Sequence, residues 1–258
     1  MDISPKVRLF VENSLTEGGT LNVDAKQAHY LLNVMRSQIG TPVALFNGRD
    51  GEWLARVSHA GKRDLVLALE RRLRPQTPEP DLWLLFAPVK RARIDFIAEK
   101  ATELGVSALV PVFTRHTVMT RVNDERLRAI AIEAAEQCER LSVPEVRAAA
   151  SLDMLLAAWP TDRKLLLLDE GGGGAPIADA LAHVAPGPAA LLVGPEGGFA
   201  KSELDGLRAL SFATPVGLGP RILRADTAVI AALSCFQALC GDWRTPLAAS
   251  PDHPRSQG

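Results

Sequence analysis

The sequence predicts an α/β protein in which a small β-rich domain precedes a larger domain of alternating strands and helices. Three observations support this prediction. Residues 1–74 carry alternating apolar and polar runs separated by glycine turns. Three prolines within residues 74–80 then interrupt the pattern. From residue 81 onward, short apolar runs alternate with stretches of helical periodicity, which is typical of buried parallel strands crossed by helices.

The front domain is expected at residues 1–74, followed by a linker at residues 75–80. Glycine turns near Gly19, Gly48 and Gly51 separate its segments. Its strands are expected at residues 41–46, 52–57 and 64–69, and its one helix at residues 24–37.

The second domain is expected at residues 81–244, with a flexible tail at residues 245–258. Its strands are expected at residues 82–87, 108–113, 165–168, 190–193 and 216–218, and its first two helices at residues 93–104 and 125–140. In the first of these helices the apolar residues recur on one face, as in a helix packed on a sheet. Four glycines at 171–174 are interpreted as a mobile loop without chemistry.

The composition argues against several classes of protein. No stretch approaches the roughly 18 consecutive apolar residues that a membrane helix needs. The amino terminus lacks the apolar segment of a secretory signal. The 3 cysteines and 5 histidines stand at no metal-ligand or catalytic-triad spacing. We therefore expect a cytoplasmic protein with reduced cysteines, no metal site and no membrane partner.

Charge is unevenly distributed along the chain. Residues 1–74 contain 11 Lys and Arg against 8 Asp and Glu, although the whole chain has a net charge of -1. Basic residues cluster around the domain junction at Lys62, Arg63, Arg71, Arg72, Arg74, Lys90, Arg91 and Arg93. Such clusters are typical of contacts with nucleic-acid phosphates, and equally of a solvated charged surface. Composition alone leaves both interpretations open.

A glycine-rich turn, Gly194-Pro-Glu-Gly-Gly-Phe199, follows the strand expected at residues 190–193. It precedes a helix that begins near Lys201, so its backbone N–H groups could hold a ligand. Neither the dinucleotide pattern nor the P-loop fits this turn, because Glu196 and Ala200 stand where those motifs require glycine.

A second turn, Leu218-Gly-Pro-Arg-Ile-Leu-Arg224, follows the strand expected at residues 216–218. It places Arg221 and Arg224 three residues apart before an apolar helix. The two guanidinium groups could bind an anion. The segment could also simply begin the helix, with Asp226 or Thr227 as N-cap, and both interpretations can hold together.

These motifs together resemble a known family. The order GPEGGF, about twenty residues, then LGPRILRADTA is similar to the two C-terminal motifs of SPOUT RNA methyltransferases. It is most similar to those of the ribosomal RNA small subunit methyltransferase E family. Residues 90–118 and 132–146 resemble internal blocks of that family, and Arg8-Leu-Phe10 with residues 29–36 resembles its PUA-like front domain. The resemblance runs from about residue 7 to Trp243.

The resemblance implies a SPOUT domain with a deep trefoil knot in its C-terminal half, against the general rule that chains are unknotted. It also implies a homodimer, S-adenosyl-L-methionine (SAM) as cofactor, and methylation of N3 of a specific uridine near the 3′ end of 16S rRNA in the small ribosomal subunit. Two alternatives stay open. One is a SPOUT ribose 2′-O-methyltransferase acting on tRNA or rRNA, and the other is a non-catalytic RNA-binding factor of ribosome assembly.

The resemblance also implies roles for individual residues. Arg221 or Arg224 is expected to stabilise the uridine anion, with Arg140 or Glu136 shaping the catalytic site from a neighbouring helix. The residues expected to enclose SAM are Leu192, Gly194, Pro195, Glu196, Gly197, Gly198, Leu218, Gly219, Ile222 and Leu223. The residues expected to contact RNA are Arg8, His29, Arg36, Lys90, Arg91 and Arg93. Glu196 could alternatively cap the following helix, and His29 and Arg36 could belong to a structural helix face.

Two positions depart from the family pattern. Ala225-Asp226 stands where the family usually has Thr-Glu, which removes a hydroxyl and shortens the arm of the carboxylate. Glu139 stands where the family tends to have glycine before the arginine at 140. We therefore expect no special backbone role at residue 139.

Overall fold

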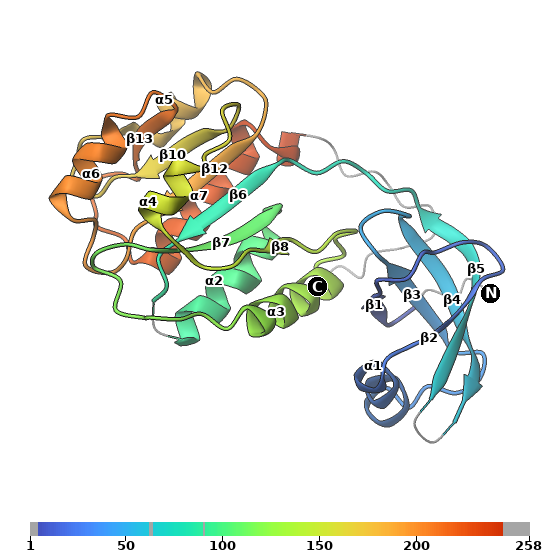
Figure 1. Ribbon diagram of the computed structural model, residues 1–258. Coiled ribbons are helices and arrows are strands. Elements are labelled where there is room, and N and C mark those ends of the chain that lie inside the picture. The colour runs from blue at the N-terminus through green and yellow to red at the C-terminus, as the bar shows by residue number, and fades with distance from the viewer. Residues whose placement is uncertain (1–4, 62–63, 90, 245–258) are drawn as a thin grey trace. The chain divides into compact units, whose positions relative to one another are not determined.

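The structure is a computed structural model that describes residues 5–61, 64–89 and 91–244. The chain divides into two compact units, each described here by itself (Figure 1). Unit 1 runs as far as Pro78 and also includes residues 135–143, whereas unit 2 holds residues 79–134 and the described residues from 144 onward. The division after Pro78 lies within the predicted linker. Residues 135–143, expected in the second domain, pack with unit 1 instead.

Unit 1 is built on a five-stranded sheet in the order β1-β3-β4-β5-β2. Its strands are β1 (Arg8–Phe10), β2 (Thr20–Asn22), β3 (Pro42–Phe46), β4 (Glu52–Ala60) and β5 (Leu65–Arg74). β1 pairs with β3 in parallel and the other pairs are antiparallel. Leu65, Leu67 and Leu69 alternate along β5 and are buried in one apolar core. The three expected strands are confirmed, and the short strands β1 and β2 were not expected.

The helix expected at residues 24–37 is shorter and changes type. α1 (Ala25–His29) begins after Asp24, whose carboxylate accepts the Gln27 N–H at 2.7 Å. It continues into a π-helical turn, η1 (Tyr30–Val34). Arg36, with a φ of 52°, adopts the left-handed backbone that ends this helical segment.

Unit 2 is built on a parallel sheet in the order β11-β13-β10-β12-β6-β7-β8, with β9 paired to β7. Its strands are β6 (Leu82–Phe86), β7 (Ala108–Phe113), β8 (Glu145–Val146), β9 (Ala150–Ser151), β10 (Lys164–Leu168), β11 (Ala175–Pro176), β12 (Ala189–Val193) and β13 (Ala213–Gly217). The central strands β6, β10 and β12 are almost continuously buried, because helices cover both faces of the sheet. The five strands expected in this domain are present, although the last begins at Ala213 and ends at Gly217 instead of spanning residues 216–218.

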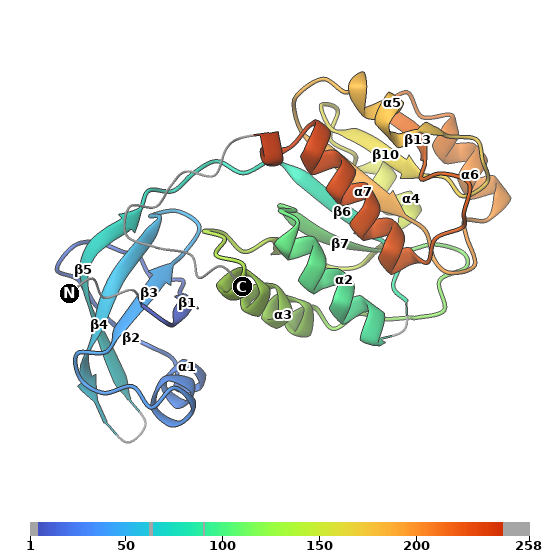
Figure 2. The same ribbon diagram turned by 180° about the vertical axis from the view of Figure 1, so that it is seen from behind.

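Helices α2 and α7 pack together on one face of this sheet, and α4 and α6 lie on the other, as the opposite views in Figures 1 and 2 show. The helices of unit 2 are α2 (Arg91–Glu103), α3 (Asp124–Gln137), α4 (Leu152–Ala157), α5 (Ile177–Ala182), α6 (Lys201–Arg208), α7 (Ala225–Leu239) and the 3-10 turn η2 (Asp242–Arg244). From Ala135 onward, the last turn of α3 belongs to unit 1. The short helices α4 and α5 were not expected, because six residues carry too little periodicity.

Candidate functional site

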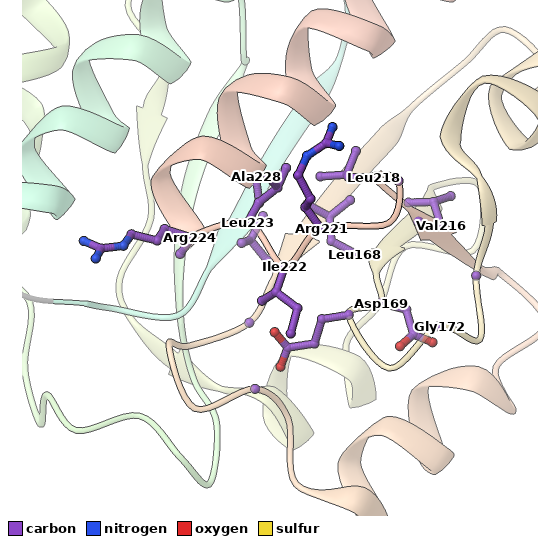
Figure 3. Close-up of a pocket in the computed structure, with 18 of the residues that line it drawn as sticks. Leu168, Asp169, Gly172, Val216, Leu218, Arg221, Ile222, Leu223, Arg224 and Ala228 are labelled. Atoms are coloured by element: carbon purple, nitrogen blue, oxygen red, sulfur yellow. The ribbon is translucent and has the colours of Figure 1, made fainter.

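Unit 2 contains a pocket of about 860 Å³ at the carboxyl ends of three adjacent strands, β12, β10 and β13 (Figure 3). Most of its lining comes from the segments that follow these strands, residues 168–174, 193–199 and 216–225. Arg93 from α2 and Ala228 from α7 also contribute. In open parallel sheets, ligands bind at this edge.

The glycine turn after β12 is held by the loop that follows β7. Gly198 has a φ of 68°, and its carbonyl oxygen lies 3.1 Å from Nδ1 of His116, which must donate to it. The Glu203 carboxylate accepts the backbone N–H of Arg115 at 2.8 Å and that of Ala200 at 3.0 Å. These bonds fix one wall of the pocket at the start of α6.

The turn after β13 leads directly into α7. Gly219 has a φ of 92°, which a residue with a side chain rarely adopts. α7 begins at Ala225 with Arg224 as its N-cap. The prediction that Asp226 or Thr227 is the N-cap is therefore wrong, because both residues lie inside the helix. The Asp226 carboxylate instead accepts the N–H of Thr227 at 3.0 Å.

The four glycines after β10, interpreted from the sequence as a mobile loop without chemistry, contribute to the pocket. Gly172 and Gly174 line the pocket. A Cβ atom on Gly174 would lie 2.6 Å from the backbone carbon of Val216, and one on Gly171 would lie 3.1 Å from Oδ1 of Asp169. The backbone of Val216 therefore leaves no room for a side chain at Gly174, and the fit at Gly171 is tight.

Two of the three carboxylates in the pocket are already paired. The side chain of Asp169 is fully buried, and Arg208 donates to it from Nε at 2.8 Å and from Nη2 at 2.5 Å. Glu196 forms an ion pair with Arg93. Glu203, rather than Glu196, caps the following helix.

Three charged groups in the pocket remain available to a ligand. Glu170, Arg221 and Arg224 have no hydrogen-bond or ion-pair partner for their side chains in the described part of the chain. Figure 3 shows Arg221 and Arg224 extending away from Asp169. The pocket thus combines one available carboxylate with two available guanidinium groups.

The structure brings together most of the residues expected to bind a cofactor. Those that line the pocket are Gly194, Pro195, Glu196, Gly198, Leu218, Gly219, Ile222 and Leu223. Leu192 and Gly197 are not among its lining residues. The side chain of Leu192 is buried in the core beneath α4 and α6, and Gly197 is exposed within the turn.

Arg8, expected to contact RNA, instead holds the end of α3 within unit 1. Its Nε donates to Glu52 at 2.6 Å. Its other two guanidinium nitrogens donate to the carbonyl oxygens of Ala135 and Glu136, both at 2.9 Å, and of Arg140, at 2.8 Å. The side chain is 10 % exposed, and all three of its nitrogens are occupied. We therefore do not propose Arg8 as an RNA contact.

Glu136 and Arg140, expected in the catalytic site, also have bonds within unit 1. The Glu136 carboxylate accepts the N–H of Phe10 at 3.0 Å, and Nη2 of Arg140 donates to Oγ of Ser142 at 3.2 Å. Neither is among the described residues that line the pocket. Glu139, between them, has a φ of 61°, so the expectation of no special backbone role at 139 is wrong.

Glu52 joins two arginines into one buried cluster. Arg74 donates to Oε2 of Glu52 at 2.7 Å and to Oε1 at 3.0 Å, and Arg8 also donates to Oε1. Burial by itself raises the pKa of Glu52, but the hydrogen bonds and charges of Arg74 and Arg8 outweigh burial, so the pKa lies below its ordinary value. The cluster is therefore ionised at neutral pH.

The other residues expected to contact RNA fall into two groups. His29 and Arg36 are exposed on α1 and just after η1, where Nδ1 of His29 lies 2.8 Å from the Asn33 amide nitrogen. Arg93 lines the pocket. Lys90 and the side chain of Arg91 lie outside the described residues.

The sequence did not predict that the segment after β10, residues 169–174, lines the pocket. The available signal was Asp169-Glu170, two carboxylates placed directly after a predicted parallel strand. In the described residues, no group of three His, Cys, Asp or Glu side chains could hold a metal ion. Within the same residues, every helix is too short or too polar to cross a bilayer.

Comparison with known proteins places the chain in a family. A family model for an RNA methyltransferase domain matches residues 76–237, and one for an RNA methyltransferase PUA domain matches residues 23–70. The chain is 31 % identical over 238 residues to ribosomal RNA small subunit methyltransferase E of Rickettsia conorii, which covers 90 % of this chain and 95 % of that protein. The protein of the same name from Bacillus subtilis is 30 % identical over 245 residues, covering 89 % and 95 %.

A solved structure agrees with these relatives. Ribosomal RNA small subunit methyltransferase E from Neisseria gonorrhoeae, crystallised bound to S-adenosyl methionine, superimposes with a TM-score of 0.82 at 26 % identity, covering 92 % of this chain and 99 % of that one. The chain therefore belongs to the ribosomal RNA small subunit methyltransferase E family, with an α/β methyltransferase domain and a PUA domain.

Proposed function

We propose that this chain transfers a methyl group from SAM to N3 of a specific uridine near the 3′ end of 16S rRNA, within the small ribosomal subunit in the cytoplasm. The observation that carries the proposal is the pocket between two glycine turns, with the unpartnered guanidinium groups of Arg221 and Arg224 beside it. The relative from Neisseria gonorrhoeae, which binds SAM, supports the choice of cofactor.

The residues present fit SAM. Leu168, Val193, Leu218 and Leu223 supply apolar walls for an adenine ring, and the glycine turns expose backbone groups to its polar edge. A pocket of about 860 Å³ is large enough for a ligand of this size. We propose Gly194, Pro195, Gly198, Gly219 and Ile222 as further contacts. SAM supplies an electrophilic methyl group on its sulfonium.

The chain must then help uridine N3 lose its proton, because protonated N3 is a poor nucleophile. Lowering the pKa of N3 by two units requires about 2.7 kcal/mol. A guanidinium about 4 Å from the developing anion supplies roughly 4 kcal/mol at an effective dielectric constant near 20, before desolvation. One arginine is enough, and we assign this role to Arg224 or Arg221.

The proposed fold includes a deep trefoil knot. In support, β10 lies between β12 and β13 in the sheet, although β12 and β13 are consecutive in this part of the chain. After β13 the chain returns to α7, which packs on β12 and α2. Residues 218–224 must therefore cross back over the carboxyl end of β10, beside the loop at residues 169–174.

We also propose that the protein acts as a homodimer. Ile222 lines the pocket and is 83 % exposed, so its apolar side chain is accessible to a second copy of the chain. For RNA contacts we propose His29 and Arg36 in unit 1 and Arg93 in unit 2, together with Lys90 and Arg91 from the sequence.

Primer extension on 16S rRNA tests the proposed chemistry. Small subunits that lack the modification are incubated with the protein and SAM, and mass mapping then locates the methylated nucleoside. Methylation at N3 blocks Watson-Crick pairing and should stop reverse transcriptase strongly at one uridine. Methylation of a ribose 2′-hydroxyl would support the alternative enzyme, and no SAM binding at millimolar concentration in calorimetry would support a non-catalytic factor.

A substitution in the glycine turn tests the pocket. Gly198→Val should abolish SAM binding, since a Cβ atom at 198 would collide with the Glu170 carboxylate and the φ of 68° disfavours valine. Circular dichroism and sedimentation should show an unchanged fold and dimer. Normal titration of SAM into this variant would contradict the location of the pocket.

A further inference from the structure

We propose that Glu170 binds the ammonium group on the methionine end of SAM. The inference rests on the proposed function, because it assigns one more residue to the same pocket. Glu170 follows Asp169 at the carboxyl end of β10, a central strand of the sheet, and lines the pocket.

The backbone on both sides of Glu170 is fixed by its neighbour. Asp169 is buried, it accepts two bonds from Arg208, and its Oδ1 accepts the N–H of Gly171 at 2.9 Å. The charge of the Asp169 carboxylate is therefore balanced by Arg208. The bonds of Asp169 hold the backbone on both sides of Glu170, which also lines the pocket.

The Glu170 carboxylate lies against the glycine turn after β12. A Cβ atom on Gly198 would collide with Oε1 of Glu170. The carboxylate therefore occupies the space where a side chain at residue 198 would lie. Gly198 is itself buried. Glu170 thus reaches from the loop at residues 169–174 to the turn at residues 194–199, and both segments line the pocket.

Glu170 is exposed, and it is the pocket carboxylate that the described residues leave without a basic partner. Asp169 is paired with Arg208, and Glu196, which the sequence placed among the residues expected to enclose SAM, is paired with Arg93. Among described residues, no basic side chain pairs with Glu170. The charge of the pocket is therefore complementary to a ligand that carries a positive group at this wall.

SAM offers two cationic groups, and their chemistry separates them. An ammonium has three N–H donors and can form charge-assisted hydrogen bonds with a carboxylate. A sulfonium has no donor. A carboxylate beside the sulfonium would also compete with the RNA as acceptor of the methyl group. The ammonium is therefore the better partner for Glu170.

Calorimetry with three ligands tests the assignment. SAM and S-adenosyl-homocysteine both carry the ammonium, but 5′-methylthioadenosine lacks it. Glu170→Gln should weaken SAM and S-adenosyl-homocysteine by the same factor, about 10- to 100-fold, and should leave 5′-methylthioadenosine unchanged. Asp205→Asn, which removes the same charge from an exposed position of α6 outside the lining, should change none of the three.

The possible failures are distinguishable. If the unsubstituted chain binds none of the three ligands, the proposed function fails and the inference fails with it. If it binds all three and Glu170→Gln binds them equally well, only the inference is overturned. A loss confined to SAM would assign Glu170 to the sulfonium, and an equal loss for all three would assign it to the shape of the pocket. Both results would contradict the proposal.

Discussion

Two groups of arginines in this protein differ in what surrounds them. In unit 1, Arg8 and Arg74 converge on the buried Glu52 and donate to the carbonyl oxygens at the end of α3 and just beyond it. In unit 2, Arg221 and Arg224 lie in a pocket and have no described partner. Because the buried Glu52 carboxylate, 6 % exposed, and the Arg8 guanidinium, 10 % exposed, must be satisfied within the protein, the first group is structural. The second group is available to a ligand.

Among these arginines, Arg8 should have the largest effect on the free energy of unfolding. Arg8→Leu leaves Glu52 with one cation and removes the Arg8 donors from three carbonyl oxygens. We expect the free energy of unfolding to fall by about 3–5 kcal/mol in urea denaturation. Arg8→Lys keeps the charge but cannot reach all four acceptors, so an intermediate loss is expected. If Arg8→Lys is as stable as the wild type but binds RNA more weakly, Arg8 contacts RNA. That result would contradict the structural role of the first group of arginines.

Arg224 should show the opposite behaviour. Arg224→Ala is expected to lower the rate of methyl transfer about 10²- to 10³-fold, since it removes a cation from the developing uridine anion. The free energy of unfolding should not change, because no described side chain depends on Arg224. SAM affinity in calorimetry should stay within a few fold, and Arg224→Lys should recover part of the rate. Loss of SAM binding would move Arg224 from the catalytic group to the cofactor site.

Acid should weaken unit 1 through Glu52. Its pKa is lowered in the folded protein, so its contribution to stability is fully present above the pKa of the unfolded chain, about 4.3. The contribution is lost as the pH falls through the lower, folded value. Thermal denaturation of the wild type between pH 6 and pH 3 should therefore show a drop that is smaller in Glu52→Gln. Equal slopes for the two proteins would show that Glu52 does not titrate with folding.

Local sequence signals predicted much of unit 2 but little of the arginine cluster. Each glycine turn follows its strand within a few residues, so GPEGG and LGPRILR were enough to find two walls of the pocket. The wall formed by residues 169–174 was missed. A run of glycines predicts a flexible loop, and the sequence does not report that Val216 packs against Gly174. Arg8 lies 127 residues from Ala135, and no pattern in one sequence reports so distant a bond. Its role as a structural residue therefore needed the structure.

The smallest effect should come from an arginine that is paired but exposed. Arg56 donates to Glu70 at 2.7 Å between β4 and β5, with side chains 29 % and 40 % exposed. Water and ions compete for both groups, so Glu70→Gln should change the free energy of unfolding by about 0–1 kcal/mol. Raising the salt to 1 M should remove this difference by screening, but should leave most of the loss in Arg8→Leu. A loss in Glu70→Gln as large and as salt-resistant as that in Arg8→Leu would mean that burial is not what separates structural arginines from available ones.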